Sequence, residues 1–270
     1  MILNKIYNED CLETMKRIPD NAIDLVLTDP PYGTTACAWD SIIPLDKMWE
    51  QLLRIAKPSA AILIFSSQPF TTKLIFSNID LFKYELIWEK NVPTGMVLAN
   101  KRPMKYHENI CVFFDQQPTY NKQLQPREWK TQPTVDSIAR RATADKHSIN
   151  NETQDWKTFS GKLKNPSSIL KFDCVPRATG TYHPTQKPVA LIKYLVETYS
   201  NSDELVLDFA MGSGTTALAC KDLGRNYIGS EISAEYCEIA ESRLAQGVLD
   251  LFTESVVEPV EGLEKEERHE

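Results

Sequence analysis

The sequence predicts an α/β protein with a doubly wound, mostly parallel sheet that carries an inserted region. Short, continuous apolar runs such as residues 23–28 (IDLVLT) and 60–65 (AAILIF) alternate with segments of helical periodicity. This alternation is typical of strands that are buried on both faces and separated by helices. The pattern stops after residue 114 and resumes near residue 188, which indicates one α/β domain interrupted by an insertion.

Each element follows from its own local pattern. In the first part of the chain, β-branched and apolar runs predict strands over 23–28, 60–65, 84–88 and 109–114, and apolar spacing predicts helices over 44–56 and 69–79. In the last part, the same criteria predict helices over 188–199, 215–223 and 233–245 and strands over 205–208 and 227–231. Pro188 suits the start of a helix and Ser233 suits an N-cap.

These elements divide the chain into four segments. We expect residues 1–114 to form one half of the α/β domain, residues 115–182 the insert, and residues 183–247 the second half of the same domain. Residues 248–270 form an acidic tail, with seven Glu against one Lys and one Arg from residue 251 onward, and we expect it to be disordered.

Composition excludes several classes of protein. The 270 residues carry a net charge of −7, yet residues 115–182 have a local charge of +4, which suits either a phosphate contact or a solvated loop. The six cysteines form no CxxC pair, so we expect neither a metal site nor a disulfide framework, and we expect a cytoplasmic protein. No apolar run approaches the ~18 residues of a membrane helix, so no membrane partner is expected.

A glycine-rich turn follows the predicted strand 205–208 in the segment LVLDFAMGSGTTALAC. Glycines allow a ligand to approach the backbone closely, and the start of the next helix offers free N–H groups. Glu231 ends the following strand, where a carboxylate can accept ribose hydroxyls. Gly212, Gly214 and Ala217 also satisfy a dinucleotide pattern, so NAD binding and a turn without a ligand both remain open. Asp208 favours a cationic methyl donor, S-adenosylmethionine, because it would repel a pyrophosphate.

The most specific feature is the segment TDPPYG at residues 28–33, directly after the strand IDLVLT. Pro30 and Pro31 stiffen the backbone and remove two N–H donors, which leaves the Asp29 carboxylate and the Pro30 carbonyl as acceptors. An exocyclic amino group offers two N–H donors to match them. Tyr32 can stack on the face of a base. The alternative is a proline turn that caps a buried strand, with Tyr32 as packing.

Together these elements resemble the DNA amino-methyltransferases that modify adenine N6 or cytosine N4. In that family an Asp-Pro-Pro-Tyr element binds the target base, and a D-P-F-x-G-S-G-T-T element binds S-adenosylmethionine. The base element comes first here, which is similar to the family's β order, a circularly permuted Rossmann-like arrangement. The resemblance covers about residues 1–247. It implies catalytic roles for Asp29, Pro30, Pro31 and Tyr32.

Four further segments support the resemblance. Two of them, residues 87–90 (IWEK) and 102–114 (RPMKYHENICVFF), are similar to the strands and loop that shape the base pocket in the family. Residues 183–188 (HPTQKP) are similar to an element beside the methionine end of the cofactor, and Asp10 stands where the family contacts the adenine of the cofactor. This sequence departs from the family in having Phe209 in place of Pro and Ala210 in place of Phe. The implied cofactor-binding residues are Asp10, Thr185, Lys187, Asp208, Phe209, Gly212, Ser213, Gly214, Thr215 and Glu231.

The resemblance also assigns the insert to target recognition on double-stranded DNA. Basic residues interleave with aromatic ones there, as expected of a surface that contacts phosphates, although an irregular solvated loop is the alternative. The residues expected to contact DNA are Arg127, Lys130, Arg140, Arg141, Lys162 and Lys164.

The function expected from sequence is therefore a site-specific DNA methyltransferase that acts on the N6 amino group of a flipped-out adenine. Adenine is favoured over cytosine N4 because cytosine members of the family more often carry Ser at the position of Asp29. An RNA or protein methyltransferase and a non-catalytic DNA-binding relic are less favoured but stay open. The sequence also does not decide whether the chain forms a homodimer or whether a cognate restriction nuclease accompanies it.

Overall fold

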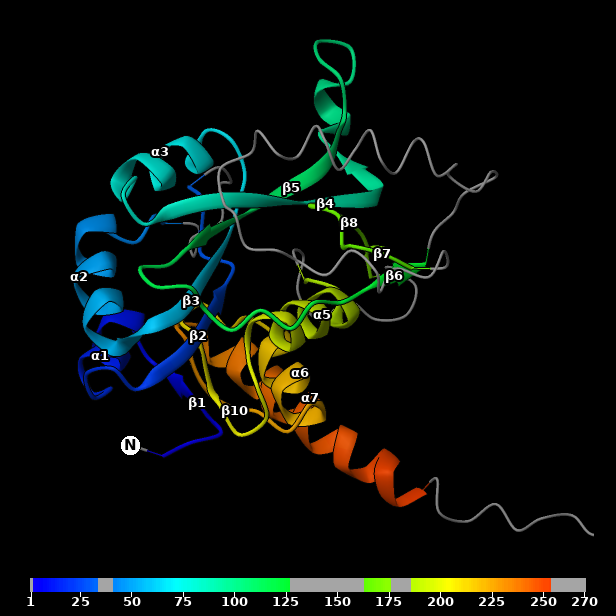
Figure 1. Ribbon diagram of the computed structural model, residues 1–270. Coiled ribbons are helices and arrows are strands. Elements are labelled where there is room, and N and C mark those ends of the chain that lie inside the picture. The colour runs from blue at the N-terminus through cyan, green and yellow to red at the C-terminus, as the bar shows by residue number, and fades with distance from the viewer. Residues whose placement is uncertain (1, 34–40, 127–162, 176–185, 254–270) are drawn as a thin grey trace, which may run out of the picture.

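An eight-stranded sheet forms the centre of the protein, with helices on both faces (Figure 1). The computed structural model describes residues 2–33, 41–126, 163–175 and 186–253. The strands are β1 (Lys5–Asn8), β2 (Ile23–Thr28), β3 (Ala56–Ser66), β4 (Phe82–Thr94), β5 (Lys105–Phe113), β8 (Ile169–Lys171), β9 (Leu205–Asp208) and β10 (Asn226–Glu231). Their order in the sheet is β1-β10-β9-β2-β3-β5-β4-β8.

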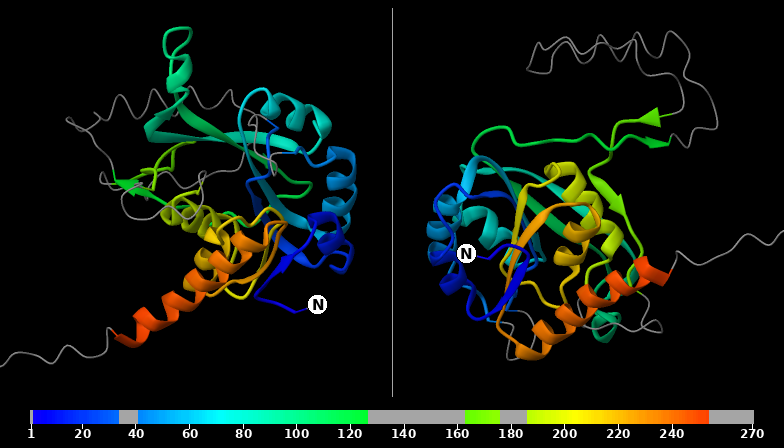
Figure 2. Two further views of the ribbon diagram at one scale, coloured as in Figure 1. Left: turned by 180° about the vertical axis from the view of Figure 1, so that it is seen from behind. Right: turned by 90° about the horizontal axis from the view of Figure 1, so that it is seen from below.

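Six of the described helices cover this sheet. Their bounds are α1 (Cys11–Lys16), α2 (Leu45–Ile55), α3 (Phe70–Ser77), α5 (Val189–Tyr199), α6 (Thr215–Asp222) and α7 (Ala234–Thr253). Helices α1, α2 and α3 lie on one face, and α5, α6 and α7 lie on the other, as both views of Figure 2 show. A short 3₁₀ helix, η1 (Met96–Leu98), lies between β4 and β5, and β6 (Gln125–Pro126) pairs with β7 (Leu163–Lys164) in a separate ribbon.

Two apolar clusters, one on each face, hold the helices to the sheet. Alternate residues of β2 supply both clusters: Leu25 and Leu27 belong to one and Val26 to the other, and all three are fully buried. Burying a side chain of this size stabilises the fold by about 1.5–3 kcal/mol. Because both faces are covered, the strands read as continuous apolar runs rather than alternating ones.

The direction of strand order reverses between β9 and β2. The chain moves outward from β2 to β3 on one side and from β9 to β10 on the other, and all of these strands are parallel. In open α/β sheets, ligands bind beyond the carboxyl ends of the strands at such a switch point. Residue 29 follows β2 and residue 208 ends β9, so the fold brings both predicted motifs to this edge.

The predicted strands 23–28 and 205–208 are confirmed with the same bounds, and the other predicted elements are present with ends shifted by up to eight residues. Strand β5 runs antiparallel to both β3 and β4, which fits the prediction of a mostly parallel sheet. Residues 169–171 of the insert form β8 and extend the main sheet beside β4. Helix α7 continues to residue 253, into the segment expected to be disordered, because nothing there breaks a helix before Pro259. Residues 254–270 lie outside the described part.

Candidate active site

The two predicted motifs lie side by side at the carboxyl edge of the sheet. Leu25 and Val26 of β2 pair with Val206 and Leu207 of β9, so by the same register Asp208, at the end of β9, lies opposite Leu27, two residues before Asp29. Neighbouring strands are about 4.8 Å apart. The two aspartates are therefore close enough for their charges to interact, and the charge of Asp29 is one cause that raises the pKa of Asp208.

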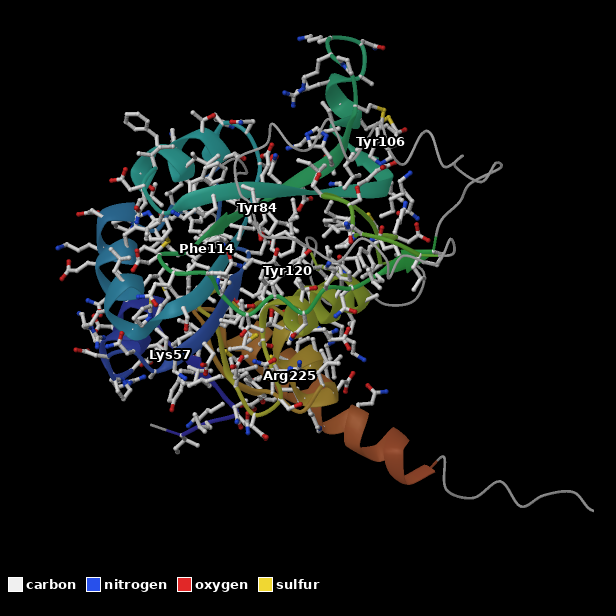
Figure 3. All side chains as sticks on the ribbon, in the orientation of Figure 1. Lys57, Tyr84, Tyr106, Phe114, Tyr120 and Arg225 are labelled. Carbon is white, nitrogen blue, oxygen red and sulfur yellow. The ribbon has the colours of Figure 1, made fainter. Side chains whose placement is uncertain are left out.

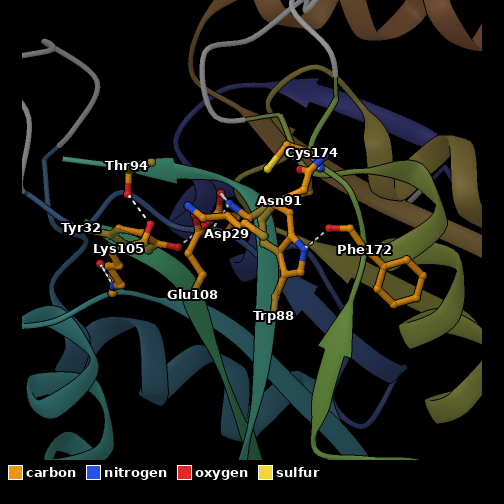
Figure 4. Close-up of polar contacts among 12 residues, drawn as sticks. Asp29, Tyr32, Trp88, Asn91, Thr94, Lys105, Glu108, Phe172 and Cys174 are labelled. Carbon is orange, nitrogen blue, oxygen red and sulfur yellow. Dashed lines mark hydrogen bonds and ion pairs between the residues drawn. The ribbon is translucent and has the colours of Figure 1, made fainter. Parts of the chain in front are cut away.

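Both carboxylate oxygens of Asp29 accept a hydrogen bond. The Tyr32 hydroxyl donates to Oδ1, and the Lys187 ammonium donates to Oδ2 (Figure 4). The Tyr32 ring stacks on Phe70, the first residue of α3, with ring centroids 5.3 Å apart and planes 24° from parallel. Tyr32 and Lys187 thus hold the Asp29 carboxylate in one orientation beside an aromatic surface.

A chain of buried charges extends from Asp29 into the sheet. Lys187 Nζ lies 3.3 Å from Glu108 Oε2, and Lys90 Nζ lies 2.8 Å from Glu108 Oε1. The two lysines are 8% and 4% exposed and the two carboxylates 22% and 18%, so two cations and two anions neutralise one another in a largely buried cluster. Removing any one of the four leaves an uncompensated buried charge, which is strongly destabilising.

Burial and pairing act in opposite directions on these groups. Burial alone would raise the pKa of Glu108, but Lys187 and Lys90 more than offset it and lower that pKa to about 2. Burial would lower the pKa of Lys187, but Asp29 and Glu108 raise it. For Asp29, burial raises the pKa and Lys187 opposes that effect. Glu108 and Lys187 are therefore ionised at neutral pH, and Asp29 has a greater proton affinity than an exposed carboxylate.

The glycine turn is shaped by two carboxylates. Asp208 accepts hydrogen bonds from Thr216 Oγ1 (2.6 Å) and from the Ala210 backbone N–H (3.1 Å). Burial nevertheless raises the pKa of Asp208 to about 6. Glu231 accepts the Gly212 N–H at 2.8 Å on Oε2 and the Ser233 N–H at 2.9 Å on Oε1. Each Glu231 oxygen accepts one of these bonds and has a second acceptor site for a ligand hydroxyl.

The two glycines of this turn have different roles. Gly214 has a φ of +81°, and a Cβ there would lie 2.7 Å from the Cβ of Ala240 in α7, so a side chain is excluded by both strain and packing. Gly212 has a φ of +52°, and a Cβ there would meet nothing within 4 Å. Gly212 borders open space, so its backbone is accessible to a ligand.

One cavity of about 700 Å³ joins the two motifs. Asp29, Pro30, Pro31 and Tyr32 line one part of it, and the turn from Asp208 to Gly212 lines another. The other cofactor-binding residues predicted from sequence that line it are Asp10, Lys187, Ser213, Thr215 and Glu231. Asp10 also caps α1 by accepting the Leu12 N–H at 2.7 Å. The volume is within the ~300–1,000 Å³ typical of small-molecule sites.

Phe209 is almost fully buried and packs with the cluster on the α1–α3 face while bordering the cavity. Ala210 is partly buried against the same cluster. The aromatic ring at position 209 therefore contributes to the core beneath the turn.

Three polar residues of this region were not predicted individually as site residues. Lys90 and Glu108 stand among polar residues (EKN at 89–91 and HEN at 107–109), in the two segments that resemble the pocket strands of the family, and no local pattern indicates that their charges are buried together. Arg243 of α7 donates to Ser213 Oγ (3.1 Å) and Thr215 Oγ1 (3.3 Å), which fixes the glycine turn from a distant helix. Lys187 was predicted only as a cofactor residue, and the structure places it on Asp29.

Several predicted residues cannot be placed. Thr185 and five of the residues expected to contact DNA lie outside the described part of the chain: Arg127, Lys130, Arg140, Arg141 and Lys162. Lys164 is half-buried in β7. Within the described ranges, no group of His, Cys, Asp or Glu is arranged to hold a metal ion. Within the same ranges, no helix has the length and apolarity that crossing a bilayer would take.

Comparison with known families and proteins agrees with this geometry. Residues 23–242 match the model of the N6/N4 methyltransferases, a family described as DNA methylase. The type II methyltransferase M.BglII of Bacillus subtilis is 31% identical over 261 residues, which cover 88% of this chain and 68% of that protein. The DNA adenine methyltransferase YhdJ of Escherichia coli strain K12 is 29% identical over 255 residues, which cover 88% of this chain and 82% of that protein.

Solved structures show the same architecture. The M1.HpyAVI–SAM complex is 26% identical with a TM-score of 0.58, and the match covers 88% of this chain and 98% of that one. The cytosine-N4-specific PvuII DNA methyltransferase has a TM-score of 0.63 at 16% identity, covering 92% of this chain and 91% of that one. At 16% identity the second match shows the fold alone.

Proposed function

This chain belongs to the N6/N4 DNA methylase family, and on that basis we propose that it transfers a methyl group from S-adenosylmethionine to the N6 amino group of an adenine rotated out of double-stranded DNA. The observation that carries the proposal is the single cavity that joins the Asp29–Tyr32 turn to the glycine turn at 212–214. An amino group held by the first turn would then lie beside a methyl group held by the second.

The cavity suits a cationic methyl donor better than a dinucleotide. Asp10, Asp208 and Glu231 line it, and this set would attract a sulfonium and repel a pyrophosphate. The open space beside Gly212 admits a ligand against the backbone, and the carboxylate of Glu231 can accept ribose hydroxyls. When bound, S-adenosylmethionine supplies the methyl group as an electrophilic carbon on a positively charged sulfur.

The chain's own residues position the amino group. The Asp29 carboxylate and the Pro30 carbonyl accept its two N–H bonds, which directs the nitrogen lone pair away from the aromatic ring. For this to happen, the base amino group must take the place of the Tyr32 hydroxyl or share Oδ1 with it, because that hydroxyl occupies Oδ1 in the structure. With the donor bound, the N–C bond would form as the C–S bond breaks and leaves its electron pair on sulfur, and the nitrogen would then release one proton. Asp29 is the nearest acceptor, and burial favours its protonation.

Lys187 and Phe70 complete the arrangement. Lys187 donates to Oδ2 of Asp29 and Tyr32 donates to Oδ1, so the carboxylate keeps one partner when Tyr32 moves. Phe70 supports the Tyr32 ring, which is available to stack on the base at a gain of about 1–3 kcal/mol.

Adenine is the proposed base for two reasons. Asp stands at position 29, where cytosine members of the family more often have Ser, and YhdJ, a relative of 29% identity, is a DNA adenine methyltransferase. The test is long-read sequencing of DNA from cells that express the chain, with Asp29→Ala as the matched control. We expect N6-methyladenine in one sequence context, absent from the control. Detection of N4-methylcytosine without N6-methyladenine would contradict the choice of base.

Filter assays with tritiated donor on DNA, RNA and protein complete the test. We expect label in DNA. Label in RNA or protein alone would contradict the choice of substrate, and no binding of the donor by calorimetry would contradict the enzymatic role.

A further inference from the structure

The loop between β4 and β5, residues 95–104, projects from the body of the protein and carries exposed apolar side chains in its short 3₁₀ helix, η1. Both Figure 1 and the left view of Figure 2 show it extending beyond the sheet. Met96 is 71% exposed, Val97 is 97% exposed and Leu98 is 36% exposed. Three large apolar side chains in a row on a projecting loop are unfavourable in water unless a partner covers them.

The same loop is basic within an acidic protein. No Asp or Glu occurs from residue 91 to residue 107, whereas Lys101, Arg102 and Lys105 do. The side chains of Lys101 and Arg102 are exposed. Since the whole chain has a net charge of −7, the loop is a local basic surface that matches a polyanion.

The base of the loop lies next to the part of the cavity assigned to the target base. Strand β4 is parallel to β2 and β3, because both β3 and β4 run antiparallel to β5, so β4 ends at the edge that carries Asp29. Lys105 Nζ donates to Ser67 Oγ at 2.6 Å, and Ser67 lies three residues before Phe70, on which Tyr32 stacks. Figure 4 shows Thr94 and Lys105 close to this cluster.

Distances along the strand give the reach of the loop. Glu108 lines the cavity three residues beyond Lys105, which is ~10 Å at 3.3 Å per residue. Tyr106, half-exposed, marks the foot of the loop in Figure 3. The ten residues 95–104 can rise roughly 15 Å further, so a duplex that delivers a base to Asp29 comes within reach of this loop.

We propose that the 95–104 loop is a DNA wedge: Met96, Val97 and Leu98 enter the base stack beside the target adenine, and Lys101 and Arg102 contact the flanking phosphates. Apolar side chains that separate base steps are a known means of unstacking a duplex. Filling the stack offsets part of the energy needed to rotate the base out. This inference rests on the proposed DNA substrate and assigns duplex opening to a loop outside the 115–182 insert.

A second copy of the chain suits the loop less well. A stable protein interface buries about 1,200–2,000 Å² and has few charges at its centre, whereas this apolar segment is three residues long and is followed closely by two cations, Lys101 and Arg102. Charge complementarity therefore favours DNA as the occupant.

The wedge is tested with the triple variant Met96→Ser/Val97→Ser/Leu98→Ser. The substrate is a short duplex with the methylated site mapped from expressing cells, either fully paired or mismatched at the target adenine. We expect kcat/KM on the paired duplex to fall at least ~10-fold and on the mismatched duplex to change less than ~3-fold, because a mismatch removes most of the opening cost. The matched control is Leu53→Ser/Phe76→Ser/Ile79→Ser, which replaces exposed apolar residues of the α2–α3 side.

The phosphate contacts are tested with Lys101→Gln/Arg102→Gln. Affinity for a generic duplex should fall. The slope of the logarithm of the association constant against the logarithm of the salt concentration should become shallower by about 1.8, which corresponds to two lost phosphate contacts. Lys47→Gln/Lys73→Gln, on α2 and α3, should leave the slope unchanged.

The outcomes separate this inference from the proposed function. Equal losses on paired and mismatched duplexes, or no loss, would overturn the wedge, provided wild type labels DNA in the same runs. If wild type labels no DNA, the proposed function fails, and the salt slope alone then decides whether the loop contacts DNA. A triple variant that changes the sedimentation of the protein but not its DNA activity would assign the loop to a second copy and overturn the inference.

Discussion

Replacement of Lys187 by Met removes the cation that lies between two buried carboxylates. The methionine chain can keep the apolar contact with the Phe65 ring, over which the ammonium now sits at 4.9 Å. Asp29 then loses its counter-charge, while Glu108 keeps Lys90 at 2.8 Å. Breaking a buried ion pair by removal of one partner costs about 3–5 kcal/mol, and we expect the free energy of unfolding to fall by that amount.

Urea denaturation at pH 7.5 measures this loss, with Lys193→Met as the matched control. Lys193 pairs with Asp222 at 2.6 Å, but both side chains are more than a third exposed, so their pair contributes only about 0.2–1 kcal/mol. The double variant Lys187→Met/Asp29→Asn removes both charges, and we expect it to be more stable than Lys187→Met alone.

The stability that Lys187→Met loses relative to wild type, its stability deficit, should also depend on pH. Without Lys187, burial raises the pKa of Asp29 further, so the folded variant holds a proton that the unfolded chain releases near pH ~3.9. Stability that comes from such a raised pKa is present at low pH and is lost as pH rises through the folded value, so the deficit grows from acid to neutral pH. A loss equal to that of Lys193→Met, with no change across pH, would refute the buried-network argument.

The remaining predictions concern the two turns. Burial raises the pKa of Asp208 to about 6. Wild type should therefore lose on the order of 3 kcal/mol of stability relative to Asp208→Asn as pH rises from about 4 to 7. Urea denaturation measures this, and parallel pH profiles for the two proteins would contradict it. Ionisation of Asp208 should also strengthen binding of S-adenosylmethionine over the same range, as calorimetry would show, and an affinity independent of pH would speak against its contact with the donor. Gly214→Ala should lower the free energy of unfolding by about 2–4 kcal/mol, because backbone strain adds to the clash with Ala240. Gly212→Ala should lower it by only about 1–2 kcal/mol and chiefly weaken donor binding. Equal shifts in Tm for the two variants would refute the distinction. Tyr32→Phe keeps the ring and should retain kcat/KM within about tenfold, whereas Tyr32→Ala should lose roughly 5–150-fold, and equal activities would exclude stacking.

Sequence patterns predicted the parts of this protein that depend on local order. Strand β9 and the turn after it were predicted because an apolar run, an aspartate and two glycines occur within ten residues. The Asp29–Tyr32 turn was predicted in the same way. Their meeting at one edge followed from the general rule for parallel sheets, and the shared cavity bears it out.

The charge network depends on long-range pairing that no local pattern contains. Lys90 and Glu108 meet because β4 pairs antiparallel with β5, where Trp88 lies opposite Glu108. Lys187 joins them from the segment before α5, nearly eighty residues further along the chain. The pairing of β8 with β4 has the same origin, since a three-residue strand in an irregular insert has no periodicity to read.

The most direct test of the central claim compares methyl transfer and donor binding in wild type and Asp29→Ala. The measurement is single-turnover transfer of tritiated methyl to a duplex that contains the mapped site, together with calorimetric titration of S-adenosylmethionine. We predict donor affinity within a few-fold of wild type and transfer slower by at least about 100-fold, because the variant lacks the acceptor that positions the amino group. Transfer at the wild-type rate would show that the nitrogen is held by other atoms and would contradict the account.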